Sequence, residues 1–158
     1  MNQLILAIVL TLMPLFELRV GLPVALIEAS KTGVPTFPVF LLILFLNILI
    51  IFFVFFFLDY LHGFLIKYSF YKKFYSAYLK IMQKKIERFE KSHKAIGFLA
   101  LFLFVAIPLP LTGAYTGSFL SWIFGLERKK SILAIALGVL FAGLVIYFGT
   151  LGVISFLN

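Results

Sequence analysis

Glu17 and Arg19 are the residues of this chain whose types and spacing most directly suggest chemistry. They are the only charged side chains between Met1 and Glu28, and apolar runs flank them on both sides. Ionisable groups at membrane depth are costly and usually mark a substrate or ion pathway. A guanidinium offers a rigid fork of donors that suits phosphate or carboxylate groups. We therefore expect Arg19 to bind an anion and Glu17 to be the ion-coupling group, which takes up a proton when the anion arrives.

The same pair also has a purely structural interpretation. Glu17 and Arg19 would then form an ion pair that fixes a turn of the chain, since charged groups with unusual environments also occur in structural networks. The residue types alone do not decide between the two interpretations.

A second candidate site lies in the sequence PLPLTGAYTG, residues 108–117, which contains no acid or base. Its hydroxyl groups, its carbonyl groups and the N–H groups that start the next helix suit passive coordination, because helix N-termini bind anions and unwound carbonyls bind Na⁺. The alternative is a simple tight turn. The candidate substrate-binding residues of both sites are Arg19, Glu17, Pro23, Pro108, Pro110, Thr112, Gly113, Tyr115, Thr116 and Gly117.

The composition places these residues in a membrane protein. Of the 158 residues, 63% are hydrophobic, and the mean hydropathy is +1.14, far outside the range of soluble domains. The absence of cysteine excludes disulfides and thiol catalysis, and two histidines alone cannot build a metal cluster. We expect no metal and no cofactor. An enzyme is disfavoured, because neither site supplies a histidine, a cysteine or a second buried carboxylate.

Most of the net charge of +8 is concentrated in residues 67–94. This segment holds nine Lys and Arg against two Glu, a net charge of +7, and its aromatic and apolar residues recur every three or four positions. That pattern predicts an amphipathic helix in the cytoplasmic interface, in contact with anionic lipids rather than with nucleic acid. The side chains expected at the membrane surface are Lys72, Lys73, Lys80, Lys84, Lys85 and Arg88.

Residues 95–126 form an apolar segment between this basic helix and the basic residues 128–130. Short basic loops remain cytoplasmic, so the segment enters and leaves the membrane from the same side. Its 32 residues are too few for two crossings of about 20 residues each. Proline and glycine at its centre disfavour a continuous helix. We therefore predict a re-entrant helical hairpin over 95–126.

Residues 4–30 contain a similar interruption. The apolar run 4–13 would be about 15 Å long as a helix, half of a bilayer core, and Pro14, Gly21 and Pro23 surround the charged pair. One interpretation is a single spanning helix kinked at Pro14. We favour a second re-entrant hairpin over 4–30, because irregular backbone at membrane depth normally lines a protein-enclosed cavity.

Two further segments, 36–58 and 132–157, are long and apolar enough to span a membrane. Asn47 interrupts the first, and we expect its amide to hydrogen-bond to a neighbouring helix rather than to contact a substrate. In the second, Ala134, Gly138 and Ala142 recur every four residues and permit close approach of another helix.

The two halves of the chain share one layout. Pro14 and Pro108 are 94 residues apart, and the same shift moves the first spanning segment onto the second. With the basic helix cytoplasmic, the two halves have opposite orientations. Inverted repeats with interrupted hydrophobic segments are typical of secondary transporters, whose site lies where the interruptions meet.

The predicted fold is an all-α polytopic membrane protein with an inverted repeat. Each half is a re-entrant helical hairpin followed by one transmembrane helix, and the cytoplasmic amphipathic helix lies between the halves. The single membrane domain over 1–158 divides into a first half, 1–66, the basic helix, 67–94, and a second half, 95–158.

The motifs of the two interruptions also carry a family resemblance. They are Pro14, Glu17, Arg19 and Pro23 in the first half and Pro108, Pro110, Thr112, Gly113 and Ala114 in the second. In combination they resemble the prokaryotic small multidrug-export proteins, distant relatives of the DedA/VTT membrane superfamily, over nearly the whole chain. The resemblance implies two facing re-entrant hairpins, lipid-type substrates such as polyprenyl phosphates, and use of the proton-motive force. The chain departs from the family pattern at Leu111, where glycine is usual, and, unlike DedA-like proteins, has no arginine in the second hairpin.

The leading functional hypothesis is a small secondary transporter or flippase, coupled to H⁺ or Na⁺, that exposes the two interruptions alternately. Its substrate would be anionic and amphipathic, a lipid phosphate or a drug-like molecule. We expect it in the plasma membrane of a prokaryote, in contact with membrane lipids and as a homodimer, because 158 residues enclose a poor pathway alone. The alternatives are a structural or accessory membrane protein and, third, an enzyme acting on lipid phosphates.

Overall fold

The computed structural model describes residues 3–69, 94–109 and 111–157, and within these ranges the protein is all-helical. The predicted basic helix with its surface residues Lys72, Lys73, Lys80, Lys84, Lys85 and Arg88 lies outside the described residues, apart from its first three residues and its last, and so does Pro110. The described helices are α1 (Gln3–Leu12), α2 (Glu17–Thr32), α3 (Thr36–Leu65), α5 (Lys94–Ala106), α6 (Ala114–Ile123) and α7 (Arg128–Leu157). The predicted all-α class is confirmed.

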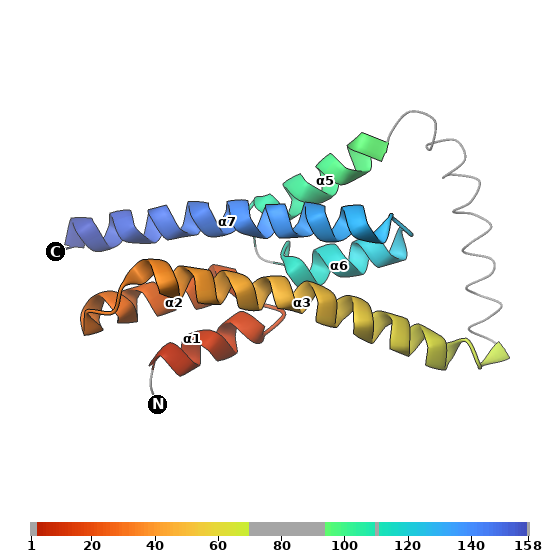
Figure 1. Ribbon diagram of the computed structural model, residues 1–158, viewed down its shortest axis with the longest axis horizontal. Helices are drawn as coiled ribbons and strands as arrows, with labels where there is room; N and C mark the ends of the chain where they lie inside the picture. Colours follow the sequence, from red (N-terminus) through yellow and green to blue (C-terminus); the bar gives the residue numbers. More distant parts are fainter. Residues whose placement is uncertain (1–2, 70–93, 110, 158) are drawn as a thin grey trace.

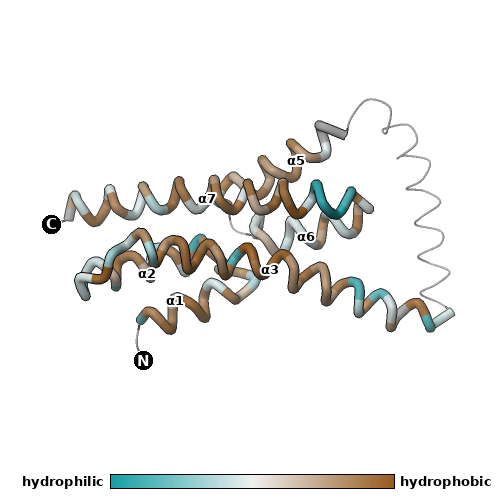
Figure 2. Tube along the Cα trace, viewed as in Figure 1, coloured by the Kyte–Doolittle hydropathy of each residue, from teal (hydrophilic) through white to brown (hydrophobic). Residues whose placement is uncertain are grey.

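The two long helices, α3 and α7, are long and apolar enough to cross a membrane. Their apolar stretches, Thr36–Phe64 and Arg128–Phe156, have 29 residues each, and 18-residue segments within them have mean hydropathies of 3.3 and 2.5. Such a helix is about 44 Å long, more than the thickness of a hydrocarbon core. Figure 2 shows hydrophobic residues along most of both helices. Each helix is longer than expected, since α3 continues seven residues beyond position 58 and α7 begins four residues before position 132.

The short helices form two pairs that approach the middle of the molecule from opposite ends (Figure 1). α1 runs to the middle and α2 returns to the end where the C-terminus lies, after which α3 crosses the whole length. α5 runs to the middle from the other end, α6 returns, and α7 crosses back antiparallel to α3. α1 packs on α2, α5 packs on α7, and α6 packs between α3 and α7.

The row of small residues on α7 has its partner within the same chain. Ala134 and Ala142 are buried, and a Cβ atom at Gly138 would lie 2.8 Å from the Cβ of Val105 and 3.0 Å from the carbonyl oxygen of Phe102. The absence of a side chain at Gly138 therefore lets α5 lie directly against α7, as small residues do at membrane helix contacts.

Each pair of short helices is joined by a break. The first break, residues 13–19, runs from the end of α1 into the first turn of α2, and the second, residues 107–115, runs from the end of α5 into the first turn of α6. The two breaks share an unusual backbone conformation. Glu17 and Leu111 are the non-glycine residues with positive φ in the described part of the chain, at 48° and 65°. They are 94 residues apart, the same separation as Pro14 and Pro108. Left-handed backbone costs a residue with a side chain about 1–2 kcal/mol, so surrounding contacts must hold it.

A charged cluster joins three helices at the end of the molecule where α3 finishes and α7 begins. Arg128 forms an ion pair with Asp59, and its guanidinium lies 5.0 Å from the ring centroid of Phe55. The indole Nε1 of Trp122 on α6 donates to Asp59 Oδ1 at 3.2 Å. These contacts hold the outer ends of α6 and α7 against α3.

Candidate functional site

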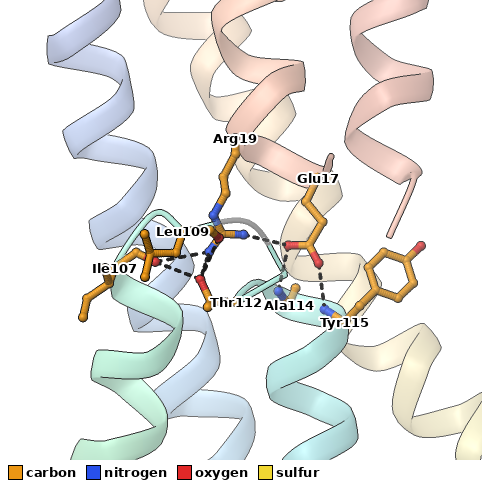
Figure 3. A network of polar contacts seen from close by, with 7 residues as sticks. All are labelled: Glu17, Arg19, Ile107, Leu109, Thr112, Ala114 and Tyr115. Carbon is orange, nitrogen blue, oxygen red and sulfur yellow. Dashed lines mark hydrogen bonds and ion pairs between the residues drawn. The ribbon is translucent and has the colours of Figure 1, made fainter. Parts of the chain in front are cut away.

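The two breaks meet at the centre of the molecule, where the first contributes side chains and the second contributes mainly backbone (Figure 3). Glu17 is the first residue of α2 and Arg19 lies in the same turn. Glu17 is 3% exposed, and the side chain of Arg19 is 13% exposed. The Glu17 side chain points from α2 toward the start of α6, and the Arg19 side chain points toward the segment that precedes α6.

The carboxylate of Glu17 binds the N-terminus of α6. Its Oε2 accepts a hydrogen bond from the N–H of Ala114 at 2.9 Å, and its Oε1 accepts one from the N–H of Tyr115 at 3.1 Å. The N-cap residue of α6 is Gly113, which has no side chain to cap these groups. Glu17 therefore acts as a cap supplied by the other half of the chain, favoured by both the free N–H groups and the helix dipole.

Gly113 leaves the space that the Glu17 carboxylate occupies. A Cβ atom at this position would lie 1.5 Å from Oε2 of Glu17 and 2.6 Å from Nη1 of Arg19. Real Cβ atoms do not approach other atoms so closely, so any side chain at position 113 is incompatible with this contact.

The guanidinium of Arg19 binds the part of the second break that precedes α6. Its Nη2 donates to the hydroxyl of Thr112 at 2.7 Å and to the carbonyl of Ile107 at 3.4 Å. Its Nη1 lies 3.6 Å from Oε2 of Glu17. The Thr112 hydroxyl in turn lies 2.9 Å from the carbonyl of Ile107 and 2.8 Å from that of Leu109, and its single proton can be donated to one of them at a time.

The N–H, carbonyl and hydroxyl groups of the second break were expected to coordinate a substrate or an ion. In the structure they bind two side chains of the first break. The N–H groups at the start of α6 bind an anion, the Glu17 carboxylate. The carbonyl of Ile107 and the hydroxyl of Thr112 bind a cation, the Arg19 guanidinium. Glu17 and Arg19 therefore bind the second break as well as each other.

The remaining predicted residues have varied positions. Tyr115 belongs to the polar network formed by Glu17, Arg19 and the second break, because its N–H group binds Glu17. Its hydroxyl donates to the carbonyl of Leu12 at 2.7 Å. Gly117 lies at a packing contact, since a Cβ there would be 2.8 Å from Cγ2 of Val105. Pro23 lies inside α2, Pro108 is exposed in the second break, and Thr116 is half-buried on α6.

Asn47 is a site residue that the sequence reasoning missed. It is 1% exposed in the middle of α3 and lines a small cavity together with Glu17 and Arg19. Its amide makes no hydrogen bond to the described residues, so the expected interhelical hydrogen bond is wrong. The sequence feature that marks this residue is a lone amide in an apolar helix, which is more often found at a helix–helix contact.

The described residues contain no group of three or more His, Cys, Asp and Glu side chains that could hold a metal ion. Among the described residues, the polar groups at the centre include the Glu17 carboxylate, the Arg19 guanidinium, the Asn47 amide, hydroxyl groups and backbone groups. Such a set can bind anions, exchange a proton and hold water.

The two long apolar helices, with this polar centre between them, define an α-helical membrane protein. A family profile with the description "Putative small multi-drug export protein" matches residues 17–145, from Glu17 into α7. The chain therefore belongs to the small multi-drug export protein family, as its motifs indicated, and the family description names export rather than catalysis. No curated protein and no solved structure matches the chain.

Proposed function

We propose that this protein is a small ion-coupled secondary transporter or flippase for an anionic amphipathic substrate. The observation that carries the proposal is the contact between the breaks, in which Glu17 occupies an anion site at the N-terminus of α6 and Arg19 lies beside it. A substrate phosphate or carboxylate has the same chemistry as the Glu17 carboxylate and would compete for the same N–H groups. The family description supports export as the general function, without naming a substrate class beyond drugs.

The proposed topology places both breaks at mid-depth in the plasma membrane of a prokaryote. α1 and α2 form one re-entrant hairpin and α5 and α6 the other, entering from opposite sides as the halves of an inverted repeat. In support, α1, α5 and α6 have only 10, 13 and 10 residues, roughly 15–20 Å of helix, which is too short to span. The common 94-residue separation of prolines and of left-handed residues supports the repeat.

The proposed mechanism exchanges one anion for another at α6. Protonation of Glu17 removes the charge that the N–H groups of Ala114 and Tyr115 bind. The substrate anion then takes the place of the carboxylate, with Arg19 as its counter-ion. Proton uptake and substrate binding therefore favour each other, and by linkage each raises the affinity of the other. With the contact between Glu17 and α6 lost, the breaks separate and the site opens to the other side.

An apolar groove beside the site supports an amphipathic substrate. It has a volume of about 330 Å³ and lies between α1, α3 and α6. Its lining residues are Leu12, Leu46, Leu49, Ile50, Phe53 and Tyr115. The groove adjoins the polar site, because its lining residue Tyr115 binds Glu17 through its N–H and the Leu12 carbonyl through its hydroxyl. We propose that the hydrocarbon part of the substrate lies here.

The test is transport by purified protein in proteoliposomes, with fluorescent phosphatidylglycerol as a lipid probe and an anionic amphipathic dye as a drug-like probe, each under a pH gradient. We expect Glu17→Gln and Arg19→Ala to lose transport. Glu28→Gln and Lys31→Ala, in the last turns of the same helix, are matched controls that retain it. Wild-type rates from both site variants would overturn the site and the mechanism.

A structural role is the second candidate, because Glu17 and Arg19 already bind groups of the second break. In that case Glu17→Gln lowers stability, and the wild-type protein moves neither probe under any gradient.

A further inference from the structure

Asn47 presents two hydrogen-bonding groups that the protein itself leaves unused. The residue is 1% exposed, and neither Oδ1 nor Nδ2 has a hydrogen-bond partner among the described residues. Nε of Arg19 is also buried without such a partner. Each unsatisfied buried group costs about 1–3 kcal/mol. Asn47 and Arg19 line the same cavity, so their three unsatisfied groups call for an explanation.

The cavity between these groups has the size of one water molecule. Its volume is about 10 Å³, and its polar lining consists of Glu17, Arg19 and Asn47, the remaining lining residues being apolar or glycine. A water site needs roughly this volume and two to four polar partners. Here Arg19 Nε and Asn47 Nδ2 can donate, and Asn47 Oδ1 and the Glu17 carboxylate can accept.

The same groups are unsuited to Na⁺. A sodium ion needs several oxygen ligands, and the carbonyl of Ile107 and the hydroxyl of Thr112 are already bound by the Arg19 guanidinium. The positive charge of the guanidinium offsets the negative charge of the Glu17 carboxylate in the cavity lining, so the site has no net charge that would attract a cation. A larger anion does not fit a cavity of about 10 Å³.

We propose that this cavity binds one water molecule, positioned by Asn47, that carries the coupling proton to and from Glu17. The inference rests on the proposed coupling role of Glu17 and adds that the coupling ion is H⁺. In the transfer, an O–H bond of the water breaks as its proton moves to the Glu17 carboxylate, and the water gains a proton from hydronium on the open side. The carboxylate becomes a neutral acid, the hydronium becomes water, and the bound water is regenerated.

Asn47→Leu tests the role of the amide, because leucine keeps the branching and the number of heavy atoms of the side chain but has no hydrogen-bonding group. A merely structural amide and a water-positioning amide predict different results. Loss of a merely structural amide leaves the transport rate of the folded protein unchanged, whereas loss of the water position lowers that rate. Removing the amide and its water together should change stability little, because both hydrogen-bonding partners are lost. We expect the thermal unfolding temperature of Asn47→Leu to be unchanged or raised, whereas proton-driven transport falls at least about tenfold. Asn47→Ser, which supplies a hydroxyl in place of the amide and leaves room for water, should keep part of the rate that Asn47→Leu loses. Ile51→Leu, one turn along α3 and also buried, is the packing control.

Infrared difference spectra recorded between two pH values test the water without a substrate. Wild-type protein should give a carboxyl band that is absent from Glu17→Gln and an O–H stretching band that shifts in H₂¹⁸O. Asn47→Leu should keep the carboxyl band and lose the ¹⁸O-sensitive band, while Ile51→Leu keeps both.

The outcomes separate this inference from the proposed function. An ¹⁸O-sensitive band that persists in Asn47→Leu, or is missing from the wild type, overturns the water site even if transport is observed. Transport driven by a Na⁺ gradient at equal pH on both sides overturns the assignment of H⁺. A wild-type protein that shows the water band and moves neither probe overturns the proposed transport and leaves the water site standing.

Discussion

The carboxylate of Glu17 caps the helix that begins at Ala114, although the two residues are 97 positions apart in the chain. A capping side chain usually belongs to the residue just before its helix. Here the cap comes from the opposite half, and a charged acceptor on two N–H groups makes stronger hydrogen bonds than a neutral one. The junction of the two halves therefore depends on the charge of one side chain.

Glu17→Gln should lower stability as well as transport. The amide oxygen can still accept one hydrogen bond from α6, but the charge and the second acceptor are lost, which we expect to cost about 1–3 kcal/mol. The measurement is thermal unfolding of the purified protein in detergent. Glu28→Gln, in the same helix but half-buried and away from the breaks, should unfold at the wild-type temperature. Equal shifts in the two variants would argue against the cap.

Gly113→Ala should be as damaging as Glu17→Gln or worse. The new Cβ would occupy the position of the Glu17 carboxylate, at 1.5 Å from Oε2, so the side chain must leave α6 or the break must move. The matched control is Gly149→Ala on α7, where a Cβ meets no atom within 4 Å. Unfolding temperature and transport should both fall only in Gly113→Ala. A tolerant Gly113→Ala would mean that the two breaks do not approach this closely.

Leu111→Gly should stabilise the protein. Leu111 has a φ of 65°, and glycine adopts this conformation without the cost of a side chain. We expect a net gain of about 0.5–1 kcal/mol after the greater flexibility of glycine in the unfolded chain is included. Leu109→Gly lies in the same break and is also exposed. It makes the unfolded chain equally more flexible but relieves no positive φ, so it should lower the stability of the protein. Thermal unfolding of both variants decides the prediction, which fails if they change in the same direction.

Thr112→Val should release one end of Arg19. The change keeps the shape of the side chain but removes the hydroxyl that accepts from Arg19 Nη2 at 2.7 Å. We expect a loss of about 1–2 kcal/mol, because the bond involves a charged donor. Thr150→Val near the end of α7 is the control. Hydrogen exchange of the amides at the start of α6 provides a second measurement, since these amides should exchange faster only in Thr112→Val.

Single cysteines test the topology directly, because the chain has none of its own. Cysteines placed at Lys67, Lys94 and Lys129 should react with a membrane-impermeant reagent only from the cytoplasmic side. A cysteine at Lys31 should react only from outside. Labelling of positions 94 and 129 from opposite sides would exclude the second re-entrant hairpin and with it the inverted repeat.

Much of the fold could be predicted from hydrophobicity and from proline and glycine. The apolar runs locate α3 and α7, and Pro14 and Pro108 lie within the observed breaks, because proline removes a helix donor wherever it occurs. Pro23 was grouped with the first break, yet α2 continues through it. The contacts around this helix decide its continuity, and they are not local in sequence.

The site was predictable in its residue types but not in its contacts. The expectation that Glu17 and Arg19 matter follows from charge in an apolar run, but their partners lie on a segment more than 85 residues away. The direction of the Glu17 side chain depends on a φ of 48° at that residue, which no residue type signals. Asn47 was assigned to helix packing because a polar residue in a spanning helix usually has a partner on a neighbour, and here the described neighbours offer none.

The capping of α6 by Glu17 also bears on the bioenergetics of a cell that makes this protein. Under the proposed mechanism, an ion that reaches the centre of the closed molecule would find its ligands already bound by Glu17 and Arg19, so the protein could be abundant without depolarising the membrane. Opening would require a substrate anion that displaces the Glu17 carboxylate from α6. Glu17 would thereby set a threshold of affinity that weakly binding anions do not reach.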